Sequence, residues 1–291
     1  MRNTIVYRHW MPGDDDAVLA FRPNTNEDWF RHKFDDEDLE PEGIRLAFLN
    51  ERVVGHVMGE LTTLDIEGKV QKFGEVMDVF VAPDMRRQGI ATRLMQEVHT
   101  YFERKGCCGS ILDLNTEASL RLYRKVGYQE VTRTLRTQLL PSSEDSQLKW
   151  TDPRLEDLKV LHQLDKRWSR QNFRVLWAPG HVKVNQFNLN NYRVLRRDSD
   201  IIGYAEWSES SEGYPSGLIW DPIVPNVDPI EVIKSIQAVI PTPLAWWTCT
   251  GSRYENPLRH LGCLFEETLD VKMIIFFGQQ IDLTRQFRTF S

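Results

Sequence analysis

The segment 76–95 combines the features of a phosphate site at the start of a helix. A valine-rich strand pattern stops at Pro83, and the run R-R-Q-G-I-A at 86–91 then opens an amphipathic helix pattern. The first N–H groups of a helix have no acceptor within it, and the helix dipole adds positive partial charge at that end. Gly89 and Ala91 keep large side chains away from the main chain, and the arginines add positive charge. The pattern predicts a pyrophosphate site; its alternative is a basic helix start that binds nothing.

The segment 114–131 holds a candidate general acid. Asn115 follows a strand pattern, and Tyr123 lies on a short helix pattern that Gly127 ends. At this spacing the helix presents Tyr123 toward the end of the sheet. A phenol there can donate a proton to a leaving group. The alternative is a core tyrosine whose hydroxyl bonds elsewhere.

Both segments resemble signatures of the GCN5-related N-acetyltransferases, the GNAT superfamily. The loop matches R-x-x-G-x-A after a strand ending in V-x-P, and the later segment is similar to the family's second signature, which ends in Y-x-x-x-G-[FY]. The resemblance implies an N-acetyltransferase that moves an acetyl group from its cosubstrate acetyl-CoA to a primary amine by direct attack. It also implies that Tyr123 protonates the coenzyme sulfur. The residues that it places around the coenzyme are Val79, Phe80, Val81, Arg86, Arg87, Gln88, Gly89, Ile90, Ala91, Thr92 and Asn115.

The general base is left open by the sequence. A primary ammonium must lose a proton before it attacks a thioester, and a carboxylate on the central strand can accept it. Glu75 is the first choice, with Asp78, Glu60 and His56 as alternatives. Because Glu75 and Asp78 are three positions apart on one strand, we expect them on opposite faces of the sheet.

These segments require an α/β fold to position them. The first half predicts the order β-α-α-β-β-β-α-β-α-β. Its predicted elements are the strands Thr4–Arg8, Arg45–Leu49, Val53–Glu60, Glu75–Val81, Ser110–Leu114 and Tyr128–Leu139 and the helices Asp14–Phe21, Asn24–Phe34, Gly89–Lys105 and Glu117–Val126.

The second half repeats much of this pattern. Gly203 corresponds to Gly55 in a predicted hairpin, and the segment from Pro257 resembles the one from Ser119. We therefore predict an α/β (α+β) fold of two tandem GNAT-like domains, each a mixed, mostly antiparallel sheet flanked by helices. The expected boundaries are a first domain at 1–140, a Pro/Ser-rich linker at 141–147 and a second domain at 148–291. The predicted elements of the second half are the strands Leu148–Trp150, Tyr192–Arg196, Ile201–Trp207, Gly217–Ile223, Leu244–Thr250 and Leu269–Phe277 and the helices Leu155–Trp168 and Pro229–Ile240.

The second half lacks the residues that predict coenzyme binding in the first. Asp221, Asp228 and three prolines stand where the phosphate loop is expected, and Leu258 replaces the tyrosine. We predict a degenerate copy that no longer binds coenzyme A. This arrangement resembles tandem acetyltransferases of the mycothiol-synthase type, which pair an active with a vestigial domain.

The composition narrows the class of protein. The chain has 291 residues and a net charge of −6, which argues against a nucleic-acid partner. No apolar run is long enough for a membrane span or a secretion signal, and the four cysteines suit a reducing compartment without a metal site, so we expect a cytoplasmic protein. The expected partner is a small-molecule or peptide amine, with the oligomeric state open. The alternative function is a non-catalytic acyl-CoA-binding sensor or scaffold of the same fold.

Overall fold

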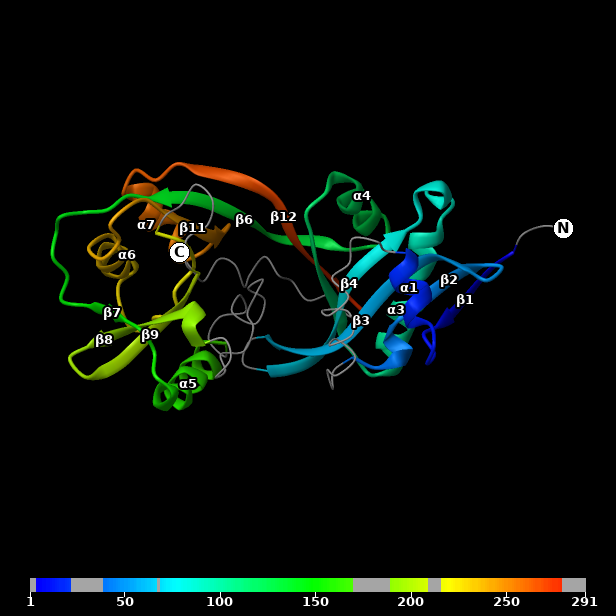
Figure 1. The fold of residues 1–291 in the computed structure, drawn as a ribbon, viewed down its shortest axis with the longest axis horizontal. Coiled ribbons are helices and arrows are strands. Elements are labelled where there is room, and N and C mark those ends of the chain that lie inside the picture. The colour runs from blue at the N-terminus through cyan, green and yellow to red at the C-terminus, as the bar shows by residue number, and fades with distance from the viewer. Residues whose placement is uncertain (1–3, 22–38, 67–68, 170–188, 209–215, 279–291) are drawn as a thin grey trace. The chain divides into compact units, whose positions relative to one another are not determined.

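The computed structural model describes residues 4–21, 39–66, 69–169, 189–208 and 216–278. The predicted helical piece Asn24–Phe34 lies outside the described residues. Within the described ranges, no helix is long and apolar enough to span a membrane. The elements form an α/β fold around a mixed sheet with the strand order β1-β2-β3-β4-β5-β12-β6-β11-β10-β9-β8-β7 (Figure 1).

The bounds of the elements agree with most of the predicted ranges. The strands are β1 (Ile5–His9), β2 (Arg45–Leu49), β3 (Arg52–Ile66), β4 (Lys69–Val81), β5 (Gly109–Leu114), β6 (Gln129–Leu139), β7 (Lys149–Thr151), β8 (Tyr192–Arg197), β9 (Asp200–Ser208), β10 (Leu218–Trp220), β11 (Leu244–Cys249) and β12 (Phe265–Phe276). The α-helices are α1 (Asp15–Phe21), α3 (Ile90–Arg104), α4 (Glu117–Lys125), α5 (Leu158–Ser169), α6 (Pro229–Gln237) and α7 (Glu255–His260). Short 3₁₀ turns include η1 (Pro41–Gly43) and η2 (Pro83–Met85).

Four predicted strands have clearly different lengths in the structure. Strand β3 runs to Ile66, well beyond its predicted end, and strand β4 begins at Lys69, well before its predicted start. Strand β10 ends at Trp220 because Pro222 has no N–H for a ladder, and Ile223 forms only an isolated bridge with Tyr204. Strand β12 begins at Phe265, four residues before the predicted Leu269.

The chain forms two compact units, and each contains a strand from the other half of the sequence. Unit 1 holds the described residues up to Val131 apart from 65–66, together with 270–278, and unit 2 holds the remainder of the described chain. In unit 1, β12 pairs antiparallel with β5, from Val271 opposite Leu114 to Phe276 opposite Gly109. In unit 2, β6 pairs antiparallel with β11 over six residue pairs. The predicted domain boundary at 141–147 remains a prediction; along the sequence the two compact units meet between Val131 and Thr132 and between Leu269 and Asp270.

Helix α3 packs closely on one face of the unit 1 sheet because glycines line that face. A Cβ atom on Gly55 would lie 2.8 Å from Cγ2 of Ile90, and one on Gly59 would lie 2.3 Å from Cγ2 of Val98. A Cβ atom on Gly74 would lie 2.4 Å from the ring of Phe102. We call this side of the unit 1 sheet the α3 face. The opposite face packs against α1, whose Val18 lies in a core cluster with residues of β2 and β3.

The two halves share local backbone geometry. In both hairpins an acidic or amide residue with positive φ occupies the turn, Asn50 at 57° and Asp198 at 54°. Both hairpins also shift register opposite a glycine, Gly55 in β3 and Gly203 in β9. The short helices end alike: the Gly127 N–H donates to the third residue before it, as the Gly262 N–H does. These matching details accompany the repeated element order.

The exchange of β12 predicts that the core of unit 1 depends on the C-terminal end of the sequence. Met273 is fully buried in the α3-face core, opposite Leu112. We expect Met273→Ala to lower the free energy of unfolding by about 2–5 kcal/mol, because it leaves a cavity. Leu269→Ala, on the same strand but 51% exposed, should change it by less than about 0.5 kcal/mol. Denaturant titration monitored by circular dichroism measures both; equal effects would contradict the assignment of β12 to this core.

Candidate active site

Strand β4 changes its pairing part-way along its length. It runs parallel to β5 only from Gly74 to Val76 within the register that the structure describes. On its other side it stays with β3, since the Ala82 N–H donates to the Val54 carbonyl at 3.0 Å. The last five residues of β4 therefore continue beyond the segment that pairs with β5.

The backbone of β4 bulges at Asp78, in the stretch beyond its described register with β5. Asp78 has φ of 58°, a left-handed conformation that is uncommon for a residue other than glycine. Its carboxylate Oδ2 lies 3.5 Å from Nδ1 of His56. His56 pairs with Leu46, whose side chain belongs to the core on the α1 side, so Asp78 faces the same way.

The expectation that Glu75 and Asp78 lie on opposite faces is wrong. Gly74 lies under Phe102 on the α3 face, so Glu75, the next residue, faces α1. The bulge then breaks the alternation of side chains, and Asp78 faces α1 as well. The sequence gives no signal for this bulge other than an aspartate among valines.

The remaining residues of the strand follow the changed alternation. Val79 and Val81 pack against the α3-face core. Phe80 faces the other way and makes an edge contact with Phe21 of α1, with ring centroids 5.1 Å apart. These three residues, which the sequence singles out as coenzyme contacts, thus lie after the bulge and beyond the β5 pairing.

The N-terminus of α3 is led by a glycine and carries no side-chain cap. Gly89 occupies the N-cap position with φ of 83° and ψ of 2°, and its carbonyl accepts the Arg93 N–H at 3.0 Å. Among the described side chains none caps this end, and the first turn of the described helix holds no acidic residue. A Cβ on Gly89 would meet no described atom within 4 Å, so the main chain is open to approach. Ile90 is buried as part of the core, while Ala91 and Thr92 are half-buried.

The loop before α3 is held by its own arginines. Arg86 Nε donates to the Val81 carbonyl at 3.1 Å, and its guanidinium lies 5.8 Å from the Phe80 ring centroid. Arg87 is exposed and has φ of 65°. Gln88 contacts the sulfur of Met85. Both arginines are exposed, and the structure ties Arg86 to the strand end.

Tyr123 lies on α4 with its side chain buried, 6% exposed. Burial raises the pKa of Tyr123 to about 12, so the phenol remains protonated at neutral pH. Its ring makes an edge contact with Tyr128, with centroids 5.9 Å apart. The Tyr128 hydroxyl instead donates to Ser110 and contacts His99, each at 2.9 Å, which marks it as structural. Asn115, the residue after β5, is exposed.

The corresponding region of unit 2 is occupied by its own side chains. The carboxylate of Asp228 caps α6 by accepting the Ile230 N–H at 2.7 Å. Asp221, just after β10, accepts hydrogen bonds at 2.8 Å from Trp246 and Thr248 and a shorter one from Ser252. An anion would have to displace the Asp228 carboxylate from this helix. The loss of phosphate binding in the second half stays a prediction.

Comparison with known proteins shows what this chain is similar to. Residues 11–128 match the model of the acetyltransferase (GNAT) family. A probable N-acyltransferase from Enterococcus faecalis V583 is similar in structure at 12% identity, over 94% of this chain and 72% of that one, with a TM-score of 0.69. A GCN5-related N-acetyltransferase from Anabaena variabilis gives 13% identity, 94% and 73% coverage, and a TM-score of 0.67. Another from Sphaerobacter thermophilus gives 13% identity, 96% and 97% coverage, and a TM-score of 0.55.

These likenesses extend the GNAT fold to nearly the whole chain. The matched family region includes β4, the α3 loop and Tyr123, and the structural matches also cover the second half. The fold class predicted from the sequence is therefore confirmed.

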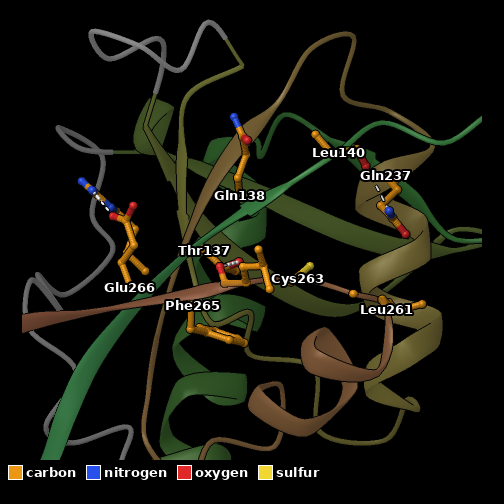
Figure 2. Close-up of a pocket in the computed structure, with 11 residues that line it drawn as sticks. Thr137, Gln138, Leu140, Gln237, Leu261, Cys263, Phe265 and Glu266 are labelled. Atoms are coloured by element: carbon orange, nitrogen blue, oxygen red, sulfur yellow. Dashed lines mark hydrogen bonds and ion pairs between the residues drawn. The ribbon is translucent and has the colours of Figure 1, made fainter.

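A separate cavity of about 510 Å³ lies in unit 2, outside residues 11–128 that match the family model (Figure 2). Its polar groups already have partners: Thr137 donates to the Leu264 carbonyl at 2.7 Å, and Gln237 donates to the Leu140 carbonyl at 3.0 Å. Arg136 and Glu266, which also line the cavity, form an ion pair. Because these groups serve the fold, we assign the cavity no role.

The raised pKa of Tyr123 makes the stability of the protein sensitive to alkaline pH. The unfolded phenol ionises near pH 10, whereas the folded one ionises at about 12, so its stabilisation is complete below pH 10 and is lost as the pH rises toward 12. We expect Tyr123→Phe to lose roughly 1 kcal/mol less of its free energy of unfolding than the wild type between about pH 8 and pH 11. Denaturant titrations at the two pH values measure this difference. Identical losses would contradict a buried Tyr123, since the other tyrosines contribute equally to both proteins.

Proposed function

We propose that the chain is an N-acetyltransferase that transfers an acetyl group from acetyl-CoA to an amine, with its site in the first half. The observation that carries the proposal is the start of α3, led by Gly89 and without a side-chain cap, next to a strand that continues past its β5 pairing. A helix start of this kind binds an anion through its main-chain N–H groups. The matched GNAT region contains both features.

The residues around this helix suit the pyrophosphate of the coenzyme. The amides of residues 89–92 belong to the first turn, where donors have no acceptor within the helix. Arg87 adds an exposed positive charge beside them, while Arg86 acts by fixing the strand end. Beyond the bulge, the main chain of Val79–Val81 would bind the pantetheine arm, with Asn115 at the end of the neighbouring strand.

Tyr123 would act as the general acid of this reaction. The coenzyme supplies an acetyl thioester, whose carbonyl carbon the amine attacks directly. The departing thiolate needs a proton, and Tyr123 is protonated because burial raises its pKa to about 12. The proton acceptor for the amine would be a carboxylate of β4, for which Glu75 is the prediction from the sequence.

The second half would serve as a degenerate copy of the same fold. Its helix start is closed by Asp228, and Leu258 stands where the first half has Tyr123. We propose that 1–140 and 148–291 derive from one ancestral domain, and that the second retains its fold because β12 completes unit 1. The proposed location is the cytoplasm, and the acceptor is a small-molecule or peptide amine.

A single charge at Gly89 tests the coenzyme site. We expect Gly89→Glu to weaken coenzyme A binding at least about 100-fold, because it places a carboxylate where a phosphate would sit. Gly106→Glu is the matched control, since Gly106 ends the same helix with φ of 76° and open space around it. That variant should bind within about threefold of the wild type. Calorimetry measures both affinities, and equal weakening would remove the assignment of the phosphate to α3.

Removal of one hydroxyl tests the general acid. We expect Tyr123→Phe to lower kcat about 10- to 1000-fold, with unchanged affinity for coenzyme A. Tyr128→Phe removes a hydroxyl that bonds Ser110 and His99, and should cost stability of about 1 kcal/mol rather than turnover. Thiol release from acetyl-CoA across a panel of amines measures turnover. Coenzyme binding without release by the wild type would favour the non-catalytic sensor instead.

A further inference from the structure

We propose that Asp78 is the catalytic base of the acetyl transfer and that His56 is its positioning residue; the inference rests on the proposed function. Nδ1 of His56 lies 3.5 Å from Oδ2 of Asp78. The His56 side chain is fully buried, whereas that of Asp78 is 13% exposed. Only the carboxylate can therefore reach a substrate, and the imidazole acts through it.

The backbone holds Asp78 in a conformation that costs free energy. A residue other than glycine at φ of 58° loses on the order of 1 kcal/mol relative to an extended one. Such strain persists where the surrounding structure fixes it, and it concentrates at functional sites. Here the strained residue is the one that contacts a buried histidine, directly before the segment assigned to the coenzyme.

The fold itself does not require a histidine at position 56. The hairpins of the two halves share their turn and their register shift, which aligns Gly55 with Gly203 and His56 with Tyr204. Tyr204 is buried to the same degree, at 1% exposed. A tyrosine thus fills the matching site in unit 2, and the imidazole of unit 1 needs a different explanation, which contact with Asp78 provides.

The position of Asp78 along β4 favours it over Glu75. Glu75 lies in the paired part of the strand, directly opposite Ile111 of β5. Asp78 lies two residues beyond the last pair, on the stretch that would line the coenzyme. Charged residues that the structure describes on this side of the sheet include Arg8, Glu60 and the Asp113–Lys272 pair, whose Nζ–O distances are 2.8 Å.

The proposed step conserves protons and covalent bonds. Asp78 accepts one proton from the ammonium of the acceptor and passes it to solvent. The neutral amine then attacks the thioester carbonyl, the C–N bond forms, and Asp78 accepts a second proton from the nitrogen. The C–S bond then breaks, and the thiolate takes a proton from Tyr123. Transfer of the proton from Asp78 to the tyrosinate through solvent restores both groups, so no other reactant is needed.

The test is chemical rescue in the full-length protein. Asp78→Gly keeps the bulge, since glycine adopts this φ without strain, and it leaves space for a small carboxylate. We expect its kcat to fall about 10²- to 10⁴-fold, with coenzyme A affinity unchanged, and added formate to restore at least about tenfold while chloride does not. Asp78→Asn, which also tolerates this φ, should lose activity without rescue.

Two further variants separate the alternatives. His56→Phe should lower kcat without changing the KM for acetyl-CoA, and Asp78→Gly with His56→Phe should lose no more than Asp78→Gly alone, because both changes act on one group. Rescue by formate of Glu75→Ala, with none for Asp78→Gly, would make Glu75 the base and overturn the proposal. A wild type that transfers acetyl to no amine in the panel would overturn the proposed function and this inference with it. If the wild type is active and Asp78→Gly loses activity that formate does not restore, the inference is overturned while the proposed function stands.

Discussion

The proposed site of unit 1 depends on how the main chain of β4 divides its hydrogen bonds between two neighbours. Its pairing with β3 extends to Ala82, whose N–H donates to Val54, while its register with β5 ends at Val76. A bulge at Asp78 separates the two regimes and turns that carboxylate toward His56. This one change of pairing determines three features of the proposed site: the main chain after the bulge, the start of α3 and the strained carboxylate.

The close approach of α3 to the sheet gives the site a fixed helix end. Glycines on β3 and β4 remove the side chains that would separate the layers, so that Ile90 and Phe102 lie against the backbone. The helix start cannot then move without loss of this packing. A rigid N-terminus, with its donors already oriented, pays less to bind an anion than a mobile loop.

The two units share local backbone geometry but differ at the start of the helix that corresponds to α3. Both have the same hairpin turn, the same register shift and the same glycine stop after the short helix. In unit 1 the helix begins with an open glycine, whereas in unit 2 Asp228 supplies the acceptor that a ligand would otherwise provide. The exchange of β6 and β12 makes the units mutually dependent. Strand β12, from the second half of the sequence, pairs with β5 in unit 1, and β6, from the first half, pairs with β11 in unit 2.

The sequence alone predicted the order of most of the described elements, the helix start at Gly89 and the tyrosine on the short helix. These features are local: caps, glycine stops and side-chain periods depend on residues within a few positions of one another. It did not predict the bulge that brings Asp78 and Glu75 to one face, nor the pairing of β12 with β5. Those depend on contacts such as Asp78 with His56, or Met273 with Leu112, between residues far apart in the chain. A strand pattern specifies which residues alternate, but only the assembled sheet decides which neighbour completes it and where the alternation breaks.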